Sequence, residues 1–151
     1  ELRELADGNP VSLTNRLSVE PFLVPHRDEF SETVGYRIRS GNRTLIFIPD
    51  IDKWEKWATN LGDLVKASDV LLLDGTFYAD GEIIRPMSEV PHPFVTETMD
   101  LLKGLAARDR AKVHFIHFNH SNPLVQKDRR KVQEVKVAGF GIASLGSRYQ
   151  L

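Results

Sequence analysis

The stretch Val113–Pro123, with the sequence VHFIHFNHSNP, decides how we interpret the fold. Its first residues, Val113–Ile116, are mostly apolar and β-favouring, which predicts a buried strand. The residues that follow, Asn119–Pro123, have turn chemistry, because Asn and Ser side chains bond the local backbone and proline stops a sheet ladder. The strand therefore ends near His117 and passes directly into a polar loop.

Three of the five histidines of the chain lie in this stretch: His114, His117 and His120. A histidine at a strand end can face a cleft while its backbone stays fixed, as metal ligands and acid–base groups require. By this reasoning His117 and His120 are candidates, although histidines in such a loop can also simply bond loop carbonyls. His114 lies inside the strand, on the opposite side from Phe115, and we expect it to be structural.

Composition excludes several classes of protein. The 151 residues are enough for one domain with a core, and 41% hydrophobic and 27% charged residues are ordinary for a globular chain. The net charge of −1 recommends neither nucleic acid nor an anionic membrane as a partner, and we expect Arg129–Lys131 to be a solvated helix face. No apolar run approaches the roughly 20 residues of a membrane span. The chain has no cysteine, so disulfides and thiolate ligands are excluded, and a cytoplasmic location is expected.

Working outward, hydrophobic periodicity predicts an α/β chain of strands and about three helices. The expected strands cover residues 17–24, 33–39, 44–48, 70–73, 113–117 and 140–145. The expected helices cover residues 53–66, 93–107 and 127–138, the first with Asp52 as its N-cap. Residues 77–91 form a long loop, which suggests a functional excursion or a lid.

Polar, ionisable residues follow several of these strands. They are His26, Asp50 with Asp52, Asp74, and His117 with His120, while His92 opens a helix. Imidazole and carboxylate without thiolate suit Zn, Mn or Fe(II). A carboxylate can bridge two metals, and a spare one such as Asp74 can fix the tautomer of a ligating histidine. The sequence therefore predicts a metal site at one rim of a sheet.

The order of these residues resembles the second half of metallo-β-lactamase-fold hydrolases. The group similar to the pyrroloquinoline quinone biosynthesis protein B is nearest in character, with the RNase Z endonucleases as distant cousins. The resemblance covers residues from about 20 to 145. It rests on His26, Gly35–Ile38, Leu45–Asp50 ending in Pro-Asp, Leu71–Phe77 as LLLDGTF, Pro91–Pro93, and Ile116–Pro123 as IHFNHSNP.

The resemblance implies roles for individual residues. His26 and His117 match histidine ligands of the family, and Asp50 matches the aspartate that bridges two metals. Asp74 and His92 fall where the endonuclease branch has a glutamate and a histidine, and together they look like a proton relay behind the metal. The implied cofactor is a divalent metal, Zn with Mn or Fe as alternatives, with two ions in the full-length protein. His120 has no equally firm counterpart.

The main metal motif of the family, His-x-His-x-Asp-His, is absent from this chain. The chain also begins at Glu1 without a methionine, so we expect it to be the C-terminal half of a longer αββα sandwich. In this interpretation residues 1–16 connect to a missing N-terminal half, and residues 17–151 supply one mixed or antiparallel sheet with its helices. One sheet face would then need a partner, either the missing half or a second copy.

Three functions remain open at this point. The first is a metal-dependent hydrolase whose metal-bound hydroxide attacks a small ester, phosphoester or lactam-like substrate, inactive as the isolated piece. The second is a metal-dependent oxidation like that implied for the quinone-cofactor group. The third is a non-catalytic binding or assembly module with an incomplete metal site. Fold membership alone does not choose among them.

Overall fold

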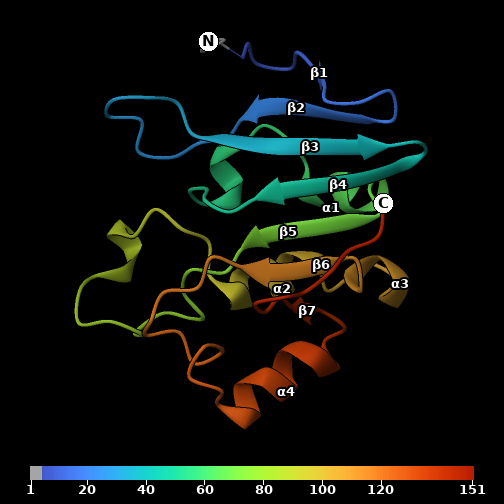
Figure 1. Cartoon of the computed structure of the whole chain (residues 1–151). Helices are drawn as coiled ribbons and strands as arrows, with labels where there is room; N and C mark the ends of the chain where they lie inside the picture. The colour runs from blue at the N-terminus through green and yellow to red at the C-terminus, as the bar shows by residue number, and fades with distance from the viewer. Residues whose placement is uncertain (1–4) are drawn as a thin grey trace.

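A seven-stranded mixed sheet organises the computed structural model, which describes residues 5–151. The order of the strands in the sheet is their order along the chain (Figure 1). They are β1 (Val11–Ser12), β2 (Leu17–Leu23), β3 (Val34–Ser40), β4 (Arg43–Ile48), β5 (Val70–Asp74), β6 (Val113–Ile116) and β7 (Gly141–Ile142). The expected connector, residues 1–16, contains β1, and its first four residues lie outside the described part of the chain.

The strand directions bring several strand ends to the same edge of the sheet. Strands β1 to β4 pair antiparallel, and β4 to β7 pair parallel. The turn between β3 and β4 contains Gly41, whose φ of 57° is the left-handed conformation that glycine adopts readily. Because of this pairing pattern, β2, β4, β5 and β6 all run in the same direction, and their carboxyl ends share one edge of the sheet.

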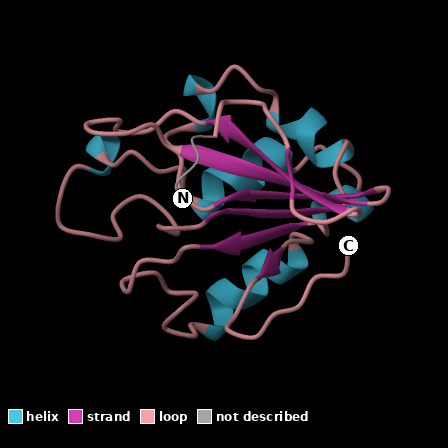
Figure 2. Ribbon diagram, turned by 45° about the horizontal axis from the view of Figure 1, so that its top comes forward, coloured by secondary structure: helices cyan, strands magenta, loops and turns pink. Residues whose placement is uncertain are grey.

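The helices lie mainly on one face of this sheet. They are α1 (Leu61–Lys66), α2 (Val95–Leu102), α3 (Ala107–Arg110) and α4 (Arg129–Val137), with short 3-10 turns η1 (Trp54–Lys56) and η2 (Met87–Glu89). Figure 1 shows α1 and α2 behind the sheet, α3 beside the start of β6 and α4 beyond the β7 end, and Figure 2 shows helices along one side of the sheet. This architecture confirms the expected mixed α/β fold, with four helices in the described residues where about three were expected. None of the helices in residues 5–151 has the length and apolar content needed to cross a bilayer.

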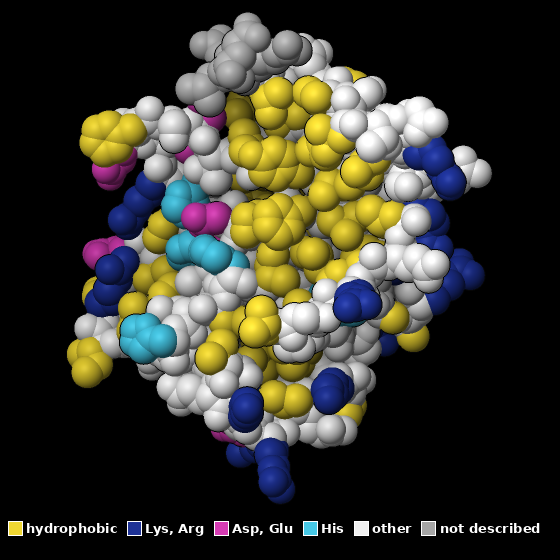
Figure 3. Space-filling model, in the orientation of Figure 1, with side chains coloured by type: hydrophobic (Ala, Val, Ile, Leu, Met, Phe, Trp, Pro, Cys, Tyr) yellow, Lys and Arg dark blue, Asp and Glu magenta, His cyan; other side chains and the backbone are white. Residues whose placement is uncertain are grey.

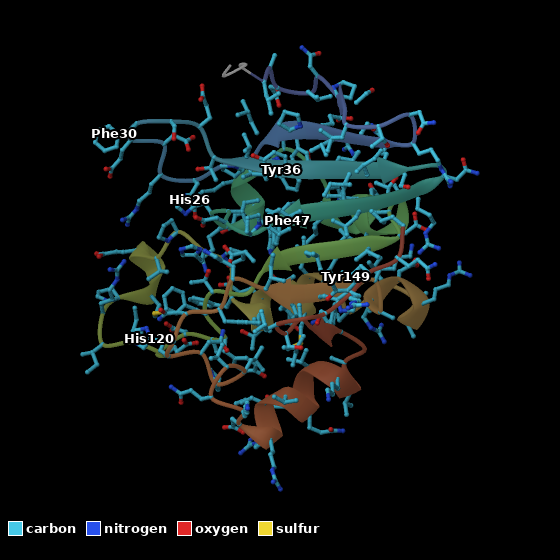
Figure 4. The ribbon with its side chains drawn as sticks, in the orientation of Figure 1. His26, Phe30, Tyr36, Phe47, His120 and Tyr149 are labelled. Atoms are coloured by element: carbon cyan, nitrogen blue, oxygen red, sulfur yellow. The ribbon has the colours of Figure 1, made fainter. Side chains whose placement is uncertain are left out.

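The two faces of the sheet differ sharply in burial. On the helix side, side chains at alternate positions are fully buried in the main core; they include Ile46, Ile48, Leu71, Leu73 and Phe115. Intervening side chains of β3 to β5 point to the other face, and those of Tyr36, Ile38, Phe47 and Leu72 are only half-buried there. Figure 3 shows this face as a broad apolar surface, and Figure 4 shows Tyr36 and Phe47 on it.

The helix expected over residues 53–66 is wrong in its extent. The chain forms η1, becomes extended at Trp57 (φ −96°, ψ 130°), and begins α1 only after Asn60. The side chain of Asn60 accepts a hydrogen bond from the backbone N–H of Asp63 at 3.0 Å and so caps α1. The two indoles have different partners: Trp54 donates to the hydroxyl of Thr98, and Trp57 donates to the carbonyl of Leu23.

The other two expected helices and the last expected strand are shorter in the structure than in the sequence pattern. The helix expected over residues 93–107 is α2, which ends at Leu102 before Gly104, and α3 is a separate short helix that begins at Ala107. The helix over residues 127–138 is α4, which Asp128 caps by accepting from the backbone N–H of Arg130 at 2.9 Å. The last strand contains only two residues of the expected 140–145.

Gly75 makes the close approach of β5 and β6 possible at their carboxyl ends. A Cβ built there would lie 2.9 Å from the ring of Phe118 and 3.0 Å from the carbonyl oxygen of Ile116. We predict that Gly75→Ala lowers the free energy of unfolding by about 1–3 kcal/mol, because the two strand ends must separate. Urea denaturation measures this change. Gly104→Ala is the matched control, since a Cβ at Gly104 meets nothing within 4 Å; an equal loss in both variants would contradict the packing argument.

Candidate metal centre

The predicted site residues converge at the shared edge of the sheet. Asp50 follows β4, Asp74 ends β5 and His117 follows β6, so the parallel strands deliver all three to one place. His26 follows β2, which ends at the same edge. The backbone N–H of Asp52 donates to the carbonyl of Pro25 at 2.7 Å and joins the loops that follow β4 and β2. Figure 3 shows histidine and acidic side chains together at this edge, beside the apolar face.

His92, which directly follows the long loop 77–91, joins this group. The backbone N–H of Val95 donates to the carbonyl of Phe77 at 3.0 Å, which brings the start of α2 to the end of β5. The imidazole Nδ1 of His92 then lies 2.8 Å from Asp74 Oδ2 and 3.3 Å from Asp50 Oδ1. The structure therefore places His92 and Asp74, for which a supporting role was expected, next to Asp50, which was expected to be a ligand.

Asp74 is buried beneath the site and makes hydrogen bonds to the residues around it. Its side chain is fully buried, and Oδ1 accepts from the backbone N–H of Thr76 at 2.8 Å and from the Thr76 hydroxyl at 2.6 Å. Oδ2 accepts from the backbone N–H of Ile51 at 3.2 Å and lies 2.8 Å from His92 Nδ1. A carboxylate has about four lone-pair sites, so Asp74 is saturated by hydrogen bonds. This places Asp74 behind the ligands, as a group that orients His92 and Thr76.

His26 and Asp50 have the opposite character. His26 Nε2 and Asp50 Oδ1 lie 2.9 Å apart, yet neither buried atom has a hydrogen-bond partner of suitable geometry among the described residues. Buried polar atoms are almost always hydrogen-bonded, so an orphaned pair needs an explanation, and an ion is one such explanation. A nitrogen and an oxygen of this kind are typical donors to Zn, Mn or Fe(II). The residues present therefore fit a metal ion.

Asp50 holds the central position among the possible ligands. Ligand atoms of His26, Asp50 and His92 lie within 4.8 Å of one another, and so do ligand atoms of Asp50, Asp74 and His117. Asp50 is the residue that these two groups share, which is the position that a carboxylate between two metals would occupy. Because Asp74 is already saturated, we regard His26, Asp50 and His117 as the better ligand candidates and His92 as a neighbour.

The backbone of His117 is unusual. Strand β6 ends at Ile116, and His117 has a φ of 59°, a left-handed conformation that is uncommon for residues other than glycine. Such strain clusters at functional sites, where the surrounding structure enforces it. The ring is exposed, and its Nδ1 lies 3.0 Å from the hydroxyl of Thr76.

The other two histidines lie apart from these groups. His114 packs edge-on against Tyr149, with ring centroids 4.9 Å apart, and against Gly141, where a Cβ would lie 2.0 Å from its Nδ1. Burial lowers the pKa of His114, which agrees with the structural role expected for it. His120 is exposed, and Figure 4 shows it well away from His26. Among the described residues His120 belongs to neither group of possible ligands.

Two residues that sequence reasoning missed hold the loops around the site. Thr76 bonds both Asp74 and His117. Asn122 is fully buried, and its amide donates to the carbonyls of Gly75 and Thr76 at 2.7 and 3.2 Å. The position of Thr76 two residues after a strand-end Asp is the local pattern of an Asx-type turn and was a usable signal. The partners of Asn122 lie 46 and 47 residues away, and nothing in the local sequence indicates them.

The carboxylates around His92 change the pKa of its imidazole. Burial alone would lower its pKa, but the hydrogen bond to Asp74 and the charges of Asp74, Asp50 and Asp52 outweigh burial and raise it. Because the pKa of His92 is higher in the folded than in the unfolded protein, these contacts stabilise the fold below the unfolded pKa. Their contribution is lost as the pH rises through the folded pKa.

We predict that Asp74→Asn lowers the pKa of His92, because its main partner loses its charge while burial remains. Proton NMR of the imidazole ring in metal-free protein, followed through a pH titration, measures this change. Asp63→Asn serves as the control, because Asp63 is exposed on α1 and pairs with Lys66 at 3.1 Å, away from the site. A His92 pKa that is the same in both variants would show that Asp74 does not govern it.

Comparison with known proteins places this geometry in a family. A family model described as "Beta-lactamase superfamily domain" matches residues 1–118. "Coenzyme PQQ synthesis protein B" of Gluconobacter oxydans (strain 621H) is 29% identical over 126 residues, which cover 80% of this chain and 40% of the relative. The protein of the same name from Pseudomonas protegens is 30% identical over 132 residues, covering 78% and 42%. The chain thus spans about half the length of the curated relatives it matches.

Solved structures show the same fold. The crystal structure of Zn(2+)-bound PqqB from Methylobacterium extorquens superimposes with a TM-score of 0.73 at 22% identity, over 92% of this chain and 52% of the other. The metallo-beta-lactamase fold protein YhfI from Bacillus subtilis gives a TM-score of 0.60 at 15% identity, over 93% and 50%. These findings confirm the resemblance seen in the sequence. The chain belongs to the beta-lactamase superfamily and is similar to the PQQ synthesis B proteins.

Proposed function

We propose that this chain supplies part of a divalent-metal centre of a hydrolase, with His26, Asp50 and His117 as ligands. The observation that supports this most strongly is the buried, unpartnered pair of His26 Nε2 and Asp50 Oδ1. Zinc is the metal we favour, because the site offers nitrogen and oxygen donors and a relative of the same fold is Zn-bound; Mn and Fe(II) remain alternatives. The relatives are about twice as long, so we propose a second ion only for a full-length protein.

A bound metal would polarise an ester, phosphoester or lactam-like group and make a coordinated water acidic enough to act near neutral pH. The residues of this chain have supporting parts in that chemistry. Asp74 holds the His92 ring by the 2.8 Å contact at Nδ1, which leaves Nε2 of His92 available to exchange a proton with a substrate or leaving group. His92 and Asp74 are therefore proposed as the proton relay.

A second function is favoured by the names of the relatives. Proteins called "Coenzyme PQQ synthesis protein B" from several bacteria match this chain, so a metal-dependent oxidation in the making of a quinone cofactor is the alternative activity. A site of histidine and carboxylate that accepts Fe(II) is compatible with it. The metal that the protein retains decides which assay is appropriate. A cytoplasmic location stays a prediction.

Metal content tests the proposed ligands directly. We predict that the intact protein retains zinc, manganese or iron near stoichiometry, and that His26→Ala or Asp50→Ala reduces it to below about a tenth, because each removes a donor. Elemental analysis by plasma mass spectrometry measures the metal, and chromogenic ester, phosphodiester and β-lactam substrates report turnover. His120→Ala is the control, since His120 lies outside the site. Metal retained by Asp50→Ala, or absent from the intact protein, would favour a non-catalytic binding module.

The half-buried face of the sheet leads to a proposal about a partner. We propose that it packs against a second sheet supplied by the N-terminal half of a longer protein, since the chain spans only about half the length of its relatives. The centre of this face consists of the side chains of Tyr36, Ile38, Phe47 and Leu72. Broad exposed apolar surfaces of this kind usually mark a site of protein–protein contact. A second copy of the chain is the competing occupant.

Charge introduced on this face tests that idea. Phe47→Glu should leave the chain folded but abolish its association with a separately produced N-terminal half, because a carboxylate would be buried without a partner. Size-exclusion chromatography with light scattering measures the association. Phe30→Glu is the matched control, because Phe30 is 99% exposed on a loop outside the face. Association that survives Phe47→Glu, or that involves only a second copy, would contradict the proposal.

A further inference from the structure

The hydroxyl of Thr76 lies between two residues of the metal site. It is buried, 2.6 Å from Asp74 Oδ1 and 3.0 Å from His117 Nδ1, and 3.1 Å from the carbonyl oxygen of His117. A hydroxyl has one proton to donate and can accept from other groups. The direction of each of these bonds therefore depends on where that single proton lies.

The other partners of Asp74 settle the direction. Both of its oxygens already accept from backbone N–H groups, Oδ1 from Thr76 at 2.8 Å and Oδ2 from Ile51 at 3.2 Å, so this side chain acts as an acceptor. If the Thr76 proton pointed to the carbonyl of His117 at 3.1 Å instead, two oxygens with lone pairs would face each other at 2.6 Å. The proton therefore goes to Asp74, and the Thr76 oxygen presents a lone pair to His117.

This arrangement fixes the state of the imidazole. The 3.0 Å contact is a hydrogen bond only if Nδ1 of His117 carries the proton and donates to Thr76. In a neutral imidazole the proton then cannot be on Nε2, which keeps the lone pair that a metal ligand needs. The order of donation is His117 Nδ1–H to Thr76, and Thr76 O–H to Asp74.

We propose that Thr76 is a positioning residue that selects the Nδ1–H tautomer of His117 and so prepares Nε2 to bind a metal. This inference rests on the metal site proposed above, since a tautomer matters only if His117 is a ligand. Removing such a partner of a ligating histidine usually lowers metal affinity by about 10- to 100-fold. Thr76 does not touch the metal in this account and acts only through His117.

The tautomer is measurable without any metal. Two-bond ¹⁵N–¹H correlation spectra of the metal-free protein at about pH 8.5, well above the ordinary histidine pKa of about 6.5, tell protonated from unprotonated ring nitrogens. We expect Nδ1–H at His117 in the native protein and in Thr76→Ser, which keeps the hydroxyl. In Thr76→Val we expect a shift toward Nε2–H, and zinc affinity measured by competition with a chelator should fall about 10- to 100-fold.

Thr98→Val is the matched control. Thr98 is also buried, and its hydroxyl accepts from Trp54 Nε1 at 2.8 Å on the helix side of the sheet, so this variant loses a buried hydroxyl without touching His117. It should leave the His117 tautomer and the zinc affinity unchanged.

Each outcome bears on the inference. Nε2–H in the native protein, or an unchanged tautomer and affinity in Thr76→Val, would overturn it. If Thr76→Val does not fold, the native protein and Thr76→Ser still decide, because the inference requires Nδ1–H in both. If the native protein shows Nδ1–H but binds no zinc, the proposed metal function fails while the control of the tautomer by Thr76 stands.

Discussion

The buried carboxylate of Asp74 is the constraint on which the rest of the site depends. Burying a carboxylate away from water costs solvation free energy, which hydrogen bonds must offset. Asp74 has such contacts with Thr76, Ile51 and His92. These partners come from the segments that follow β5 and β4 and from the loop before α2. One buried group therefore holds three loops together, whereas His26 Nε2 and Asp50 Oδ1, 2.9 Å apart, have no hydrogen bond among the described residues.

The sheet explains why these loops meet. Its strands β2, β4, β5 and β6 run in one direction, so every segment that leaves them begins at the same edge. The helix side of the sheet is closed by a packed core, and the opposite face remains apolar and half-buried (Figure 3). One face of the sheet is thus covered by helices and the other is left open. This is consistent with the relatives being about twice as long as the chain.

Much of this arrangement was predictable from the sequence. The strands, and the placement of His26, Asp50, Asp74 and His117 at strand ends, follow from local hydrophobic patterns. The pairing of His92 with Asp74 was expected only from the resemblance to the family. The break before α1 was missed because the Asn60 cap competes with a plausible helix pattern. The roles of Thr76 and Asn122 were missed because their partners are set by tertiary structure, which a local pattern does not report.

X-ray absorption at the zinc edge of the zinc-loaded protein tests the central claim most directly. We expect nitrogen and oxygen ligands at about 2.0–2.1 Å, with the outer-shell scattering that imidazole rings produce. That imidazole signal should decrease in His26→Ala. A shell of oxygen atoms without imidazole scattering, or a spectrum that His26→Ala leaves unchanged, would contradict the account and leave the cluster around Asp74 as a structural feature of the fold.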